Sequence, residues 1–200
     1  MSEQSSPNET YYFNSNDHNC VYDFCRKLNQ IVGQNREQNQ DMVIVCIGSD
    51  RATGDCLGPI IGYKLSKIQN RHFHVYGTLS SPVHAKNLEN TMALINEKHP
   101  DALIVAVDAS LGTTRHVGFI TLGKGTLKPG SGVNKELPCV GDIFITGIVN
   151  ISGFLGNSIL QTTRLHVVMR MADCICTGIH YLMQEQLQES ERKENRPIRT

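Results

Sequence analysis

The chain has 200 residues, and its 19 basic and 19 acidic side chains give a formal net charge of zero at pH 7. This length suits one domain with a sizeable core, and the balanced charge argues against a nucleic-acid or anionic membrane surface as partner. No apolar run approaches the length of a membrane span, and seven scattered cysteines favour free thiols over a disulfide framework.

The N-terminal segment 1–16 is polar and lacks both the basic and the apolar region of a signal peptide. We expect this segment to be disordered because it holds too little apolar surface to fold. Beyond it, apolar residues recur at helical spacing as far as Val32. This spacing predicts a helix with Asp17 as its N-cap and Gly33 as its end.

Short apolar runs then alternate with helical patterns along the rest of the chain. The runs that predict strands cover residues 42–47, 73–79, 102–107, 116–122 and 142–149. One helix is expected between the first and second strands, and another between the second and third. After the fifth strand, a short helix is expected over 154–160 and a long one over 163–188. This alternation is typical of an α/β sandwich on a largely parallel sheet, with the fourth strand antiparallel. The charged residues 191–200 are expected to fray, which leaves a single domain over residues 17–190.

Three chemically active side chains follow the first three predicted strands. Asp55 lies in a polar, Gly-containing loop after the first strand, His84 follows the second, and Asp108 follows the third. Right-handed crossovers bring the carboxyl ends of parallel strands to one edge of a sheet. The topology therefore predicts that these three residues lie on the same side.

Two carboxylates at one edge suit either of two chemistries. They can share a proton, with one acting as base and the other as acid, or they can bind a divalent metal ion with His84 as a further ligand. The alternative is structural, because Asp55 can cap a helix and Asp108 can bind loop amides. Asn87 stands one helical turn beyond His84 and is expected to face the same cleft.

A Gly-rich stretch contains Gly130, Ser131 and Gly132, whose backbone N–H groups can bind an anion or a peptide carbonyl. The same composition also suits an ordinary loop. It matches neither a P-loop nor a dinucleotide-binding fingerprint. Cys56 adjoins Asp55, whose charge disfavours a reactive thiolate, so a cysteine nucleophile is not expected.

Four segments occur in an order that resembles the YyaC family of sporulation proteins. They are GSDRATGDCLGP at 48–59, PVHAKNL at 82–88, VDA at 107–109 and KPGSGV at 128–133. The resemblance covers roughly residues 41–188. The chain is more remotely similar to the spore germination protease. The wider fold resembles that of the hydrogenase-maturation endopeptidases, which implies a three-layer α/β/α sandwich with a mostly parallel mixed sheet, of the phosphorylase/hydrolase-like kind.

The resemblance implies roles for the two aspartates. Asp55 and Asp108 match the functional aspartates of the germination protease, an aspartic-type endopeptidase that degrades small acid-soluble spore proteins. They also match the two acids that bind nickel, together with a histidine, in the hydrogenase-maturation endopeptidases, where the first acid is glutamate. The matching histidine is not identified by the pattern, and His84 is a candidate from topology alone. Ser49 departs from both peptidase groups, which tend to have asparagine there.

We therefore expect an endopeptidase in the cytoplasm of the forespore or mother cell of a spore-forming bacterium, acting on a peptide or protein, a spore protein among the candidates. Asp55 and Asp108 would be catalytic. The expected substrate-binding residues are His84, Asn87, Gly130, Ser131 and Gly132. Two alternatives stay open: an inactive ligand- or peptide-binding protein on this fold, and a metal-dependent hydrolase or metal sensor. A divalent ion is the one cofactor considered, no nucleic-acid or membrane partner is expected, and the sequence does not indicate an oligomeric state.

Overall fold

The computed structural model describes residues 9–37, 40–68, 70–130, 137–153 and 156–194. In this part of the chain, six strands form one mixed sheet in the order β1-β5-β6-β4-β2-β3. The strands are β1 (Thr10–Asn14), β2 (Met42–Cys46), β3 (Phe73–Tyr76), β4 (Leu103–Gly112), β5 (Phe119–Lys124) and β6 (Ile143–Ile151). Strands β3, β2, β4 and β6 run parallel, whereas β5 is antiparallel to both of its neighbours, as the sequence predicted.

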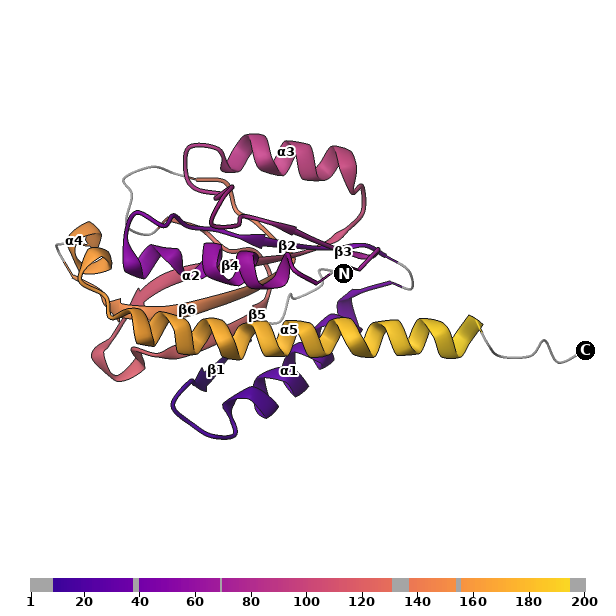
Figure 1. Cartoon of the computed structure of the whole chain (residues 1–200), viewed down its shortest axis with the longest axis horizontal. Helices are drawn as coiled ribbons and strands as arrows, with labels where there is room; N and C mark the ends of the chain where they lie inside the picture. The colour runs from indigo at the N-terminus through magenta and orange to yellow at the C-terminus, as the bar shows by residue number, and fades with distance from the viewer. Residues whose placement is uncertain (1–8, 38–39, 69, 131–136, 154–155, 195–200) are drawn as a thin grey trace, which may run out of the picture.

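Helices cover both faces of the sheet. The helices are α1 (Cys20–Asn35), α2 (Leu57–Leu65), α3 (Leu88–Lys98), α4 (Gly156–Gln161) and α5 (Leu165–Glu194), with short 3₁₀ helices η1 (Thr53–Cys56) and η2 (Thr114–His116). Helix α5 packs against α1 and α2 on one face, and α3 lies on the other. Figure 1 shows α3 at the top of the molecule, with α1 and α5 at the bottom. The three-layer α/β/α sandwich is therefore confirmed.

Strand β2 explains why the sequence shows an unbroken apolar run. Ile44 and Cys46 belong to the core beneath α1, α2 and α5, whereas Val43, Val45 and Ile47 belong to the smaller core beneath α3. Successive side chains of a strand point to opposite faces, so a central strand covered on both sides needs apolar residues at every position. All five residues of β2 are buried.

The prediction that residues 1–16 form a disordered tail is wrong for Thr10–Asn14, which form β1 at the edge of the sheet. Successive side chains of this strand point to opposite faces, so that Phe13 packs against the core while Tyr12 is exposed. The Phe13 and Phe24 rings meet edge to face with centroids 5.5 Å apart. A polar composition therefore hid a strand of alternating pattern. Residues 1–8 lie outside the described residues.

Several other boundaries differ from the predictions, among them the start of α1, where Asn19 and not Asp17 is the N-cap. Strand β4 continues to Gly112, five residues beyond its expected end at residue 107. Helix α1 continues past Gly33 to Asn35, because a glycine with open space around it does not by itself end a helix. Helix α5 reaches Glu194, so the expected frayed tail is helical over 191–194. Among the described residues, no helix is both long enough and apolar enough to cross a membrane.

Candidate active site

Hydrogen bonds beyond the end of β2 connect the loop after β2 to β4 and to the loop after β3. The Ile47 N–H donates to the Val107 carbonyl of β4 at 2.7 Å, and the Gly48 N–H donates to the Val83 carbonyl at 2.8 Å. Ile47 also forms a parallel β-bridge with Val83. The loops that follow β2 and β3 therefore adjoin β4 next to Asp108, so the three segments meet on one side, as the topology predicted.

The loop after β2 packs tightly against its own strand. Gly48 has a φ of +138°, and a Cβ at this position would lie 2.1 Å from the main-chain oxygen of Asp55. The Ser49 N–H donates to that same oxygen at 3.0 Å. A Cβ at Gly58 would lie 2.1 Å from the carbonyl oxygen of Ile47. Glycine at these two positions lets the loop fold back and places Asp55 beside the end of β2.

Asp108 lies within β4, where its partner in β6 is Thr146. Its side chain is buried, and its Oδ1 accepts a hydrogen bond from the Ala109 N–H at 2.8 Å. Burial and then the nearby charge of Asp55 raise the pKa of Asp108 to about 8, against the hydrogen bonds from the Ala109 and Gly130 backbone. Asp108 is therefore a carboxyl group that keeps its proton at neutral pH.

Asp55 is partly buried and more acidic than its neighbour. Burial raises the pKa of Asp55 to about 6, against a backbone hydrogen bond from Ser49 and the charge of His84. The Asp55 charge contributes to the raised pKa of Asp108, so the two carboxyl groups lie close enough to interact. Near pH 7 this pair holds about one proton, located mainly on Asp108.

His84 and Asn87 lie in the loop that joins β3 to α3. The Asn87 Oδ1 accepts a hydrogen bond from the His84 N–H at 2.8 Å, and the Asn87 Nδ2 donates to the Pro82 carbonyl at 3.0 Å. Both bonds hold the shape of the loop that carries His84. The His84 Nδ1 is buried and has no hydrogen-bond partner among the described residues. The hydrogen-bonding capacity of this nitrogen is therefore unused among the described residues.

The predicted Gly-rich segment is described only in part. Gly130 has a φ of 75° and contributes its backbone N–H to Asp108, so this donor orients the carboxyl group. Ser131 and Gly132 lie outside the described residues.

A row of hydroxyl groups beside Asp108 was not predicted. Thr121 of β5, Thr146 of β6 and Asp108 are successive partners across three adjacent strands. The two threonine hydroxyls lie 2.6 Å apart, and the Ser110 Oγ donates to the Thr146 Oγ1 at 3.2 Å. Threonines inside otherwise apolar strands were the signal for this row. Its position next to Asp108 depends on strand register, which the sequence does not reveal.

The cysteine adjacent to Asp55 does not suit a nucleophilic role. Burial raises the pKa of the Cys56 thiol, and its Sγ donates to the Thr53 carbonyl at 2.8 Å. The Asp55 charge raises the pKa further, against a backbone hydrogen bond. A protonated thiol is a poor nucleophile.

The fit of a metal ion to this site depends on convergence of the donor atoms. Among the described residues, Asp55, His84 and Asp108 do not form a group whose ligand atoms all lie within 4.8 Å of one another. Their chemistry suits a divalent ion, but in this arrangement their donor atoms do not meet around one position.

Residues 12–178 match the sequence family described as a protein of unknown function (DUF1256). The chain belongs to this family. Asp55, His84 and Asp108 all fall within the matched region.

Two individual proteins are similar to this DUF1256 chain. The protein YyaC of Bacillus subtilis strain 168, whose name describes it as uncharacterized, is 52% identical over 138 residues, which cover 69% of this chain and 67% of YyaC. The predicted resemblance to the YyaC family is thus confirmed. The crystal structure of the [NiFe] hydrogenase maturation protease HycI from Thermococcus kodakarensis KOD1 aligns with 14% identity and a TM-score of 0.49, over 79% of this chain and 99% of HycI.

Proposed function

We propose that this protein is a peptidase-like hydrolase in which Asp55 and Asp108 activate water against a peptide carbonyl. The observation that carries the proposal is the pairing of a buried Asp108, whose pKa is raised to about 8, with Asp55, whose pKa is raised to about 6. Two carboxyl groups whose pKa values are pushed to either side of neutrality are suited to opposite roles in acid–base catalysis.

The roles follow from which group holds the proton. Asp55 is the ionised group near pH 7 and accepts a proton from the attacking water. Asp108 is the protonated group and supplies a proton to the carbonyl oxygen or to the leaving amine. The water oxygen then bonds to the carbonyl carbon, and the C–N bond breaks as the nitrogen is protonated.

The remaining predicted residues would bind and orient the substrate. His84 offers a buried Nδ1 with no hydrogen-bond partner among the residues that the structure describes, and Asn87 positions its loop. Because the Gly130 N–H already serves Asp108, the proposal assigns stabilisation of the oxyanion to the backbone of Ser131 and Gly132.

The proposed substrate is a peptide or protein, and a sporulation role is proposed on the resemblance of the motifs to the YyaC family and the germination protease. Small acid-soluble spore proteins are the first substrates to test. The proposed compartment is the cytoplasm of the forespore or mother cell. The resemblance supports these finer statements because both aspartates coincide with the functional aspartates of the germination protease.

The test is a cleavage assay with purified small acid-soluble spore proteins, run beside the Asp108→Asn variant. Removal of one catalytic carboxyl group is expected to lower the rate by about 10²–10⁴-fold. Asp101→Asn is the matched control, because Asp101 is exposed, has a φ of 65° and lies at the opposite edge of the sheet before β4. Asparagine tolerates this left-handed conformation, so the control should retain the full rate.

Other outcomes distinguish the alternatives. Equal cleavage by the wild type and Asp108→Asn would contradict the proposal. Peptide binding by the wild type without any cleavage would support a binding protein on this fold. Cleavage that a chelator abolishes and added divalent metal restores would identify a metal-dependent hydrolase instead.

A further inference from the structure

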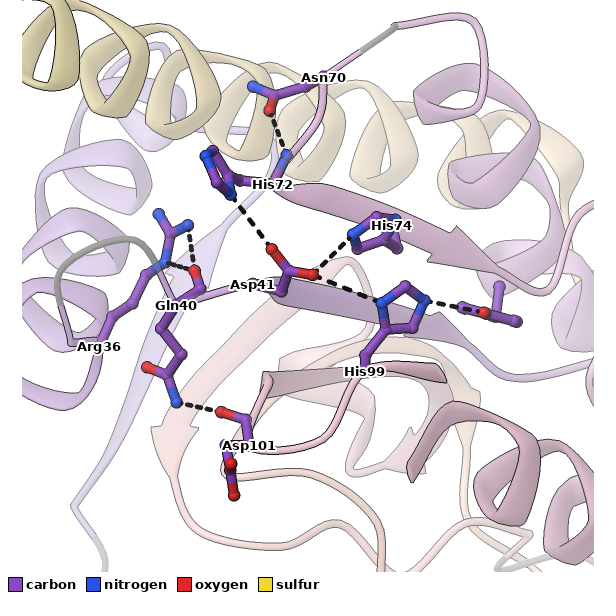
Figure 2. Close-up of polar contacts among 9 residues, drawn as sticks. Arg36, Gln40, Asp41, Asn70, His72, His74, His99 and Asp101 are labelled. Carbon is purple, nitrogen blue, oxygen red and sulfur yellow. Dashed lines mark hydrogen bonds and ion pairs between the residues drawn. The ribbon is translucent and has the colours of Figure 1, made fainter. Parts of the chain in front are cut away.

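A second cluster of ionisable side chains lies at the opposite edge of the sheet, where β2 and β3 begin. This histidine–aspartate cluster consists of Asp41, His72, His74 and His99. The parallel register pairs Met42 with Phe73, so Asp41 stands beside His72. His72 and His74 point to the same side because strand residues alternate. His99 follows the last turn of α3, which covers that side. Figure 2 shows the three imidazole rings arranged around one carboxylate.

The donor atoms of this cluster converge on the Asp41 carboxylate. The His74 Nε2 lies 3.1 Å and the His99 Nδ1 lies 3.5 Å from the Asp41 Oδ2, while the His72 Nδ1 lies 3.2 Å from the Oδ1. The His74 and His99 rings stack with centroids 3.9 Å apart and an interplanar angle of 29°. Ligand atoms of Asp41, His74 and His99 all lie within 4.8 Å of one another.

We propose that Asp41, His74 and His99 bind a divalent first-row transition-metal ion. Zinc is a suitable ion with which to test this site. In a tetrahedral zinc site with bonds of about 2.0–2.1 Å, neighbouring ligand atoms lie about 3.3 Å apart. The two distances from the Asp41 Oδ2, 3.1 and 3.5 Å, lie on either side of that spacing. Two histidines and one carboxylate are a donor set that zinc, iron, cobalt and nickel accept.

The surroundings hold these ligands in the way that metal sites require. The His99 Nε2, on the far side of the ring from Asp41, lies 3.1 Å from the Tyr76 hydroxyl. The Asp41 Oδ1, which contacts neither His74 nor His99, lies within hydrogen-bond distance of the His72 Nδ1. The backbone N–H of His72 in turn donates to the Asn70 Oδ1 at 2.9 Å. Metal-binding histidines usually bind a partner through the second ring nitrogen, and metal-binding carboxylates are hydrogen-bonded as well.

The exposure of these side chains also suits a cation. The side chain of Asp41 is 34% exposed and that of His99 is 12% exposed, so an ion has access and the fourth coordination position can hold water.

This site would act independently of the carboxylate pair. The three ligands come from the start of β2, from β3 and from the residue after α3, so an ion would join three segments that are distant in sequence. Asp55 and Asp108 lie at the other end of β2 and contribute no ligand. The ion would stabilise the folded state by mass action, since the ligands converge only after folding.

The test is a zinc titration of untagged protein that has been stripped with a chelator and dialysed. We expect one equivalent to bind to the wild type, and at least about a 10-fold loss of affinity in His74→Gln and in His99→Gln. The matched control is His166→Gln, because His166 is exposed on α5. The double variant Asp55→Asn/Asp108→Asn should bind zinc as the wild type does, which separates this site from the proposed catalytic pair.

Two further readouts keep the result independent of folding defects. Melting curves without zinc show whether each variant folds. With zinc, the wild type, His166→Gln and Asp55→Asn/Asp108→Asn should gain stability, whereas His74→Gln and His99→Gln should not. Cobalt should give a visible absorption spectrum that is lost in His74→Gln. Full binding in both His74→Gln and His99→Gln, no saturable binding to the wild type, or binding abolished by Asp55→Asn/Asp108→Asn would each overturn the proposal.

Discussion

The buried carboxyl group of Asp108 should make the stability of the protein depend on pH. Its pKa rises from 3.8, the value expected in the unfolded chain, to about 8 in the folded state. The folded state therefore retains a proton that the unfolded state releases. This contribution to stability is fully present below about pH 4 and is lost as the pH rises toward 8. Asp55, with a folded pKa of about 6, adds a smaller loss between pH 4 and 6.

Asp108→Asn is consequently predicted to stabilise the protein at alkaline pH while it abolishes the proposed hydrolysis. Asparagine resembles the protonated carboxyl group and can still accept the hydrogen bond from Ala109. A difference of one unit between the folded and unfolded pKa corresponds to about 1.4 kcal/mol. We therefore expect the free energy of unfolding to rise by at least about 2 kcal/mol at pH 8 and to change little at pH 4. Urea unfolding at both pH values measures this. A variant that is destabilised equally at both pH values would contradict the prediction.

At the residue scale, the sequence was sufficient to identify candidate site residues, but it did not predict their burial or their contacts. Asp55 and Asp108 could be identified because each follows a run of buried-strand residues. The burial of Asp108 could not be predicted, because it depends on the position of β4 between β2 and β6. His72 and His74, spaced two apart at the start of a strand, were a usable signal for shared orientation. Their convergence with Asp41 required the register of β2 against β3.

At the scale of elements, the turn from β2 into η1 depends on glycine at position 48. Gly48→Ala would place a methyl group 2.1 Å from the Asp55 carbonyl oxygen at a φ of +138°. We expect a loss of at least about 2 kcal/mol in the free energy of unfolding, since both the clash and the strained backbone must be relieved. Because the displaced group belongs to Asp55, the proposed hydrolysis should fall as well.

The matched control for that variant is Gly33→Ala in α1. Nothing lies within 4 Å of the Cβ position at Gly33, so alanine should stabilise the helix by up to about 1 kcal/mol. Thermal or urea unfolding of the two variants measures both predicted changes, a loss of stability in Gly48→Ala and a gain in Gly33→Ala. Equal stability of Gly48→Ala and the wild type would show that the β2–η1 turn relaxes easily, contrary to the prediction.

The elements themselves were predictable where periodicity was strong. The strand 42–47 and a helix between the second and third strands were expected from their apolar spacing, and both are present. The ends of β4 and the existence of β1 were not predicted. Asp108 pairs with Thr146 and β4 continues beyond it because β6 extends alongside, which is a tertiary effect. Strand β1 forms because β5 offers an unpaired edge and α1 offers Phe24.

At the scale of the whole molecule, β1 and the proposed chemistry lie at different parts of the sheet. The order β1-β5-β6-β4-β2-β3 places two strands between β1 and β4, which carries Asp108. Deletion of residues 1–14 should therefore reduce stability without a change in the mechanism of the site. The loss should be at least about 2 kcal/mol, because Tyr11 and Phe13 pack against the core and Phe13 pairs with the Phe24 ring.

Deletion of residues 1–8 alone is the control, since it leaves β1 in place. Without β1, the backbone of β5 becomes an open sheet edge, so self-association at high concentration is also expected and can be followed by light scattering. Cleavage per folded molecule should stay within about twofold of the wild type at a temperature where both are folded. If the deletion of 1–14 instead changed the pH dependence of cleavage, β1 would have to act on the carboxylate pair through β5 and β6. That result would contradict the prediction that β1 does not affect the site.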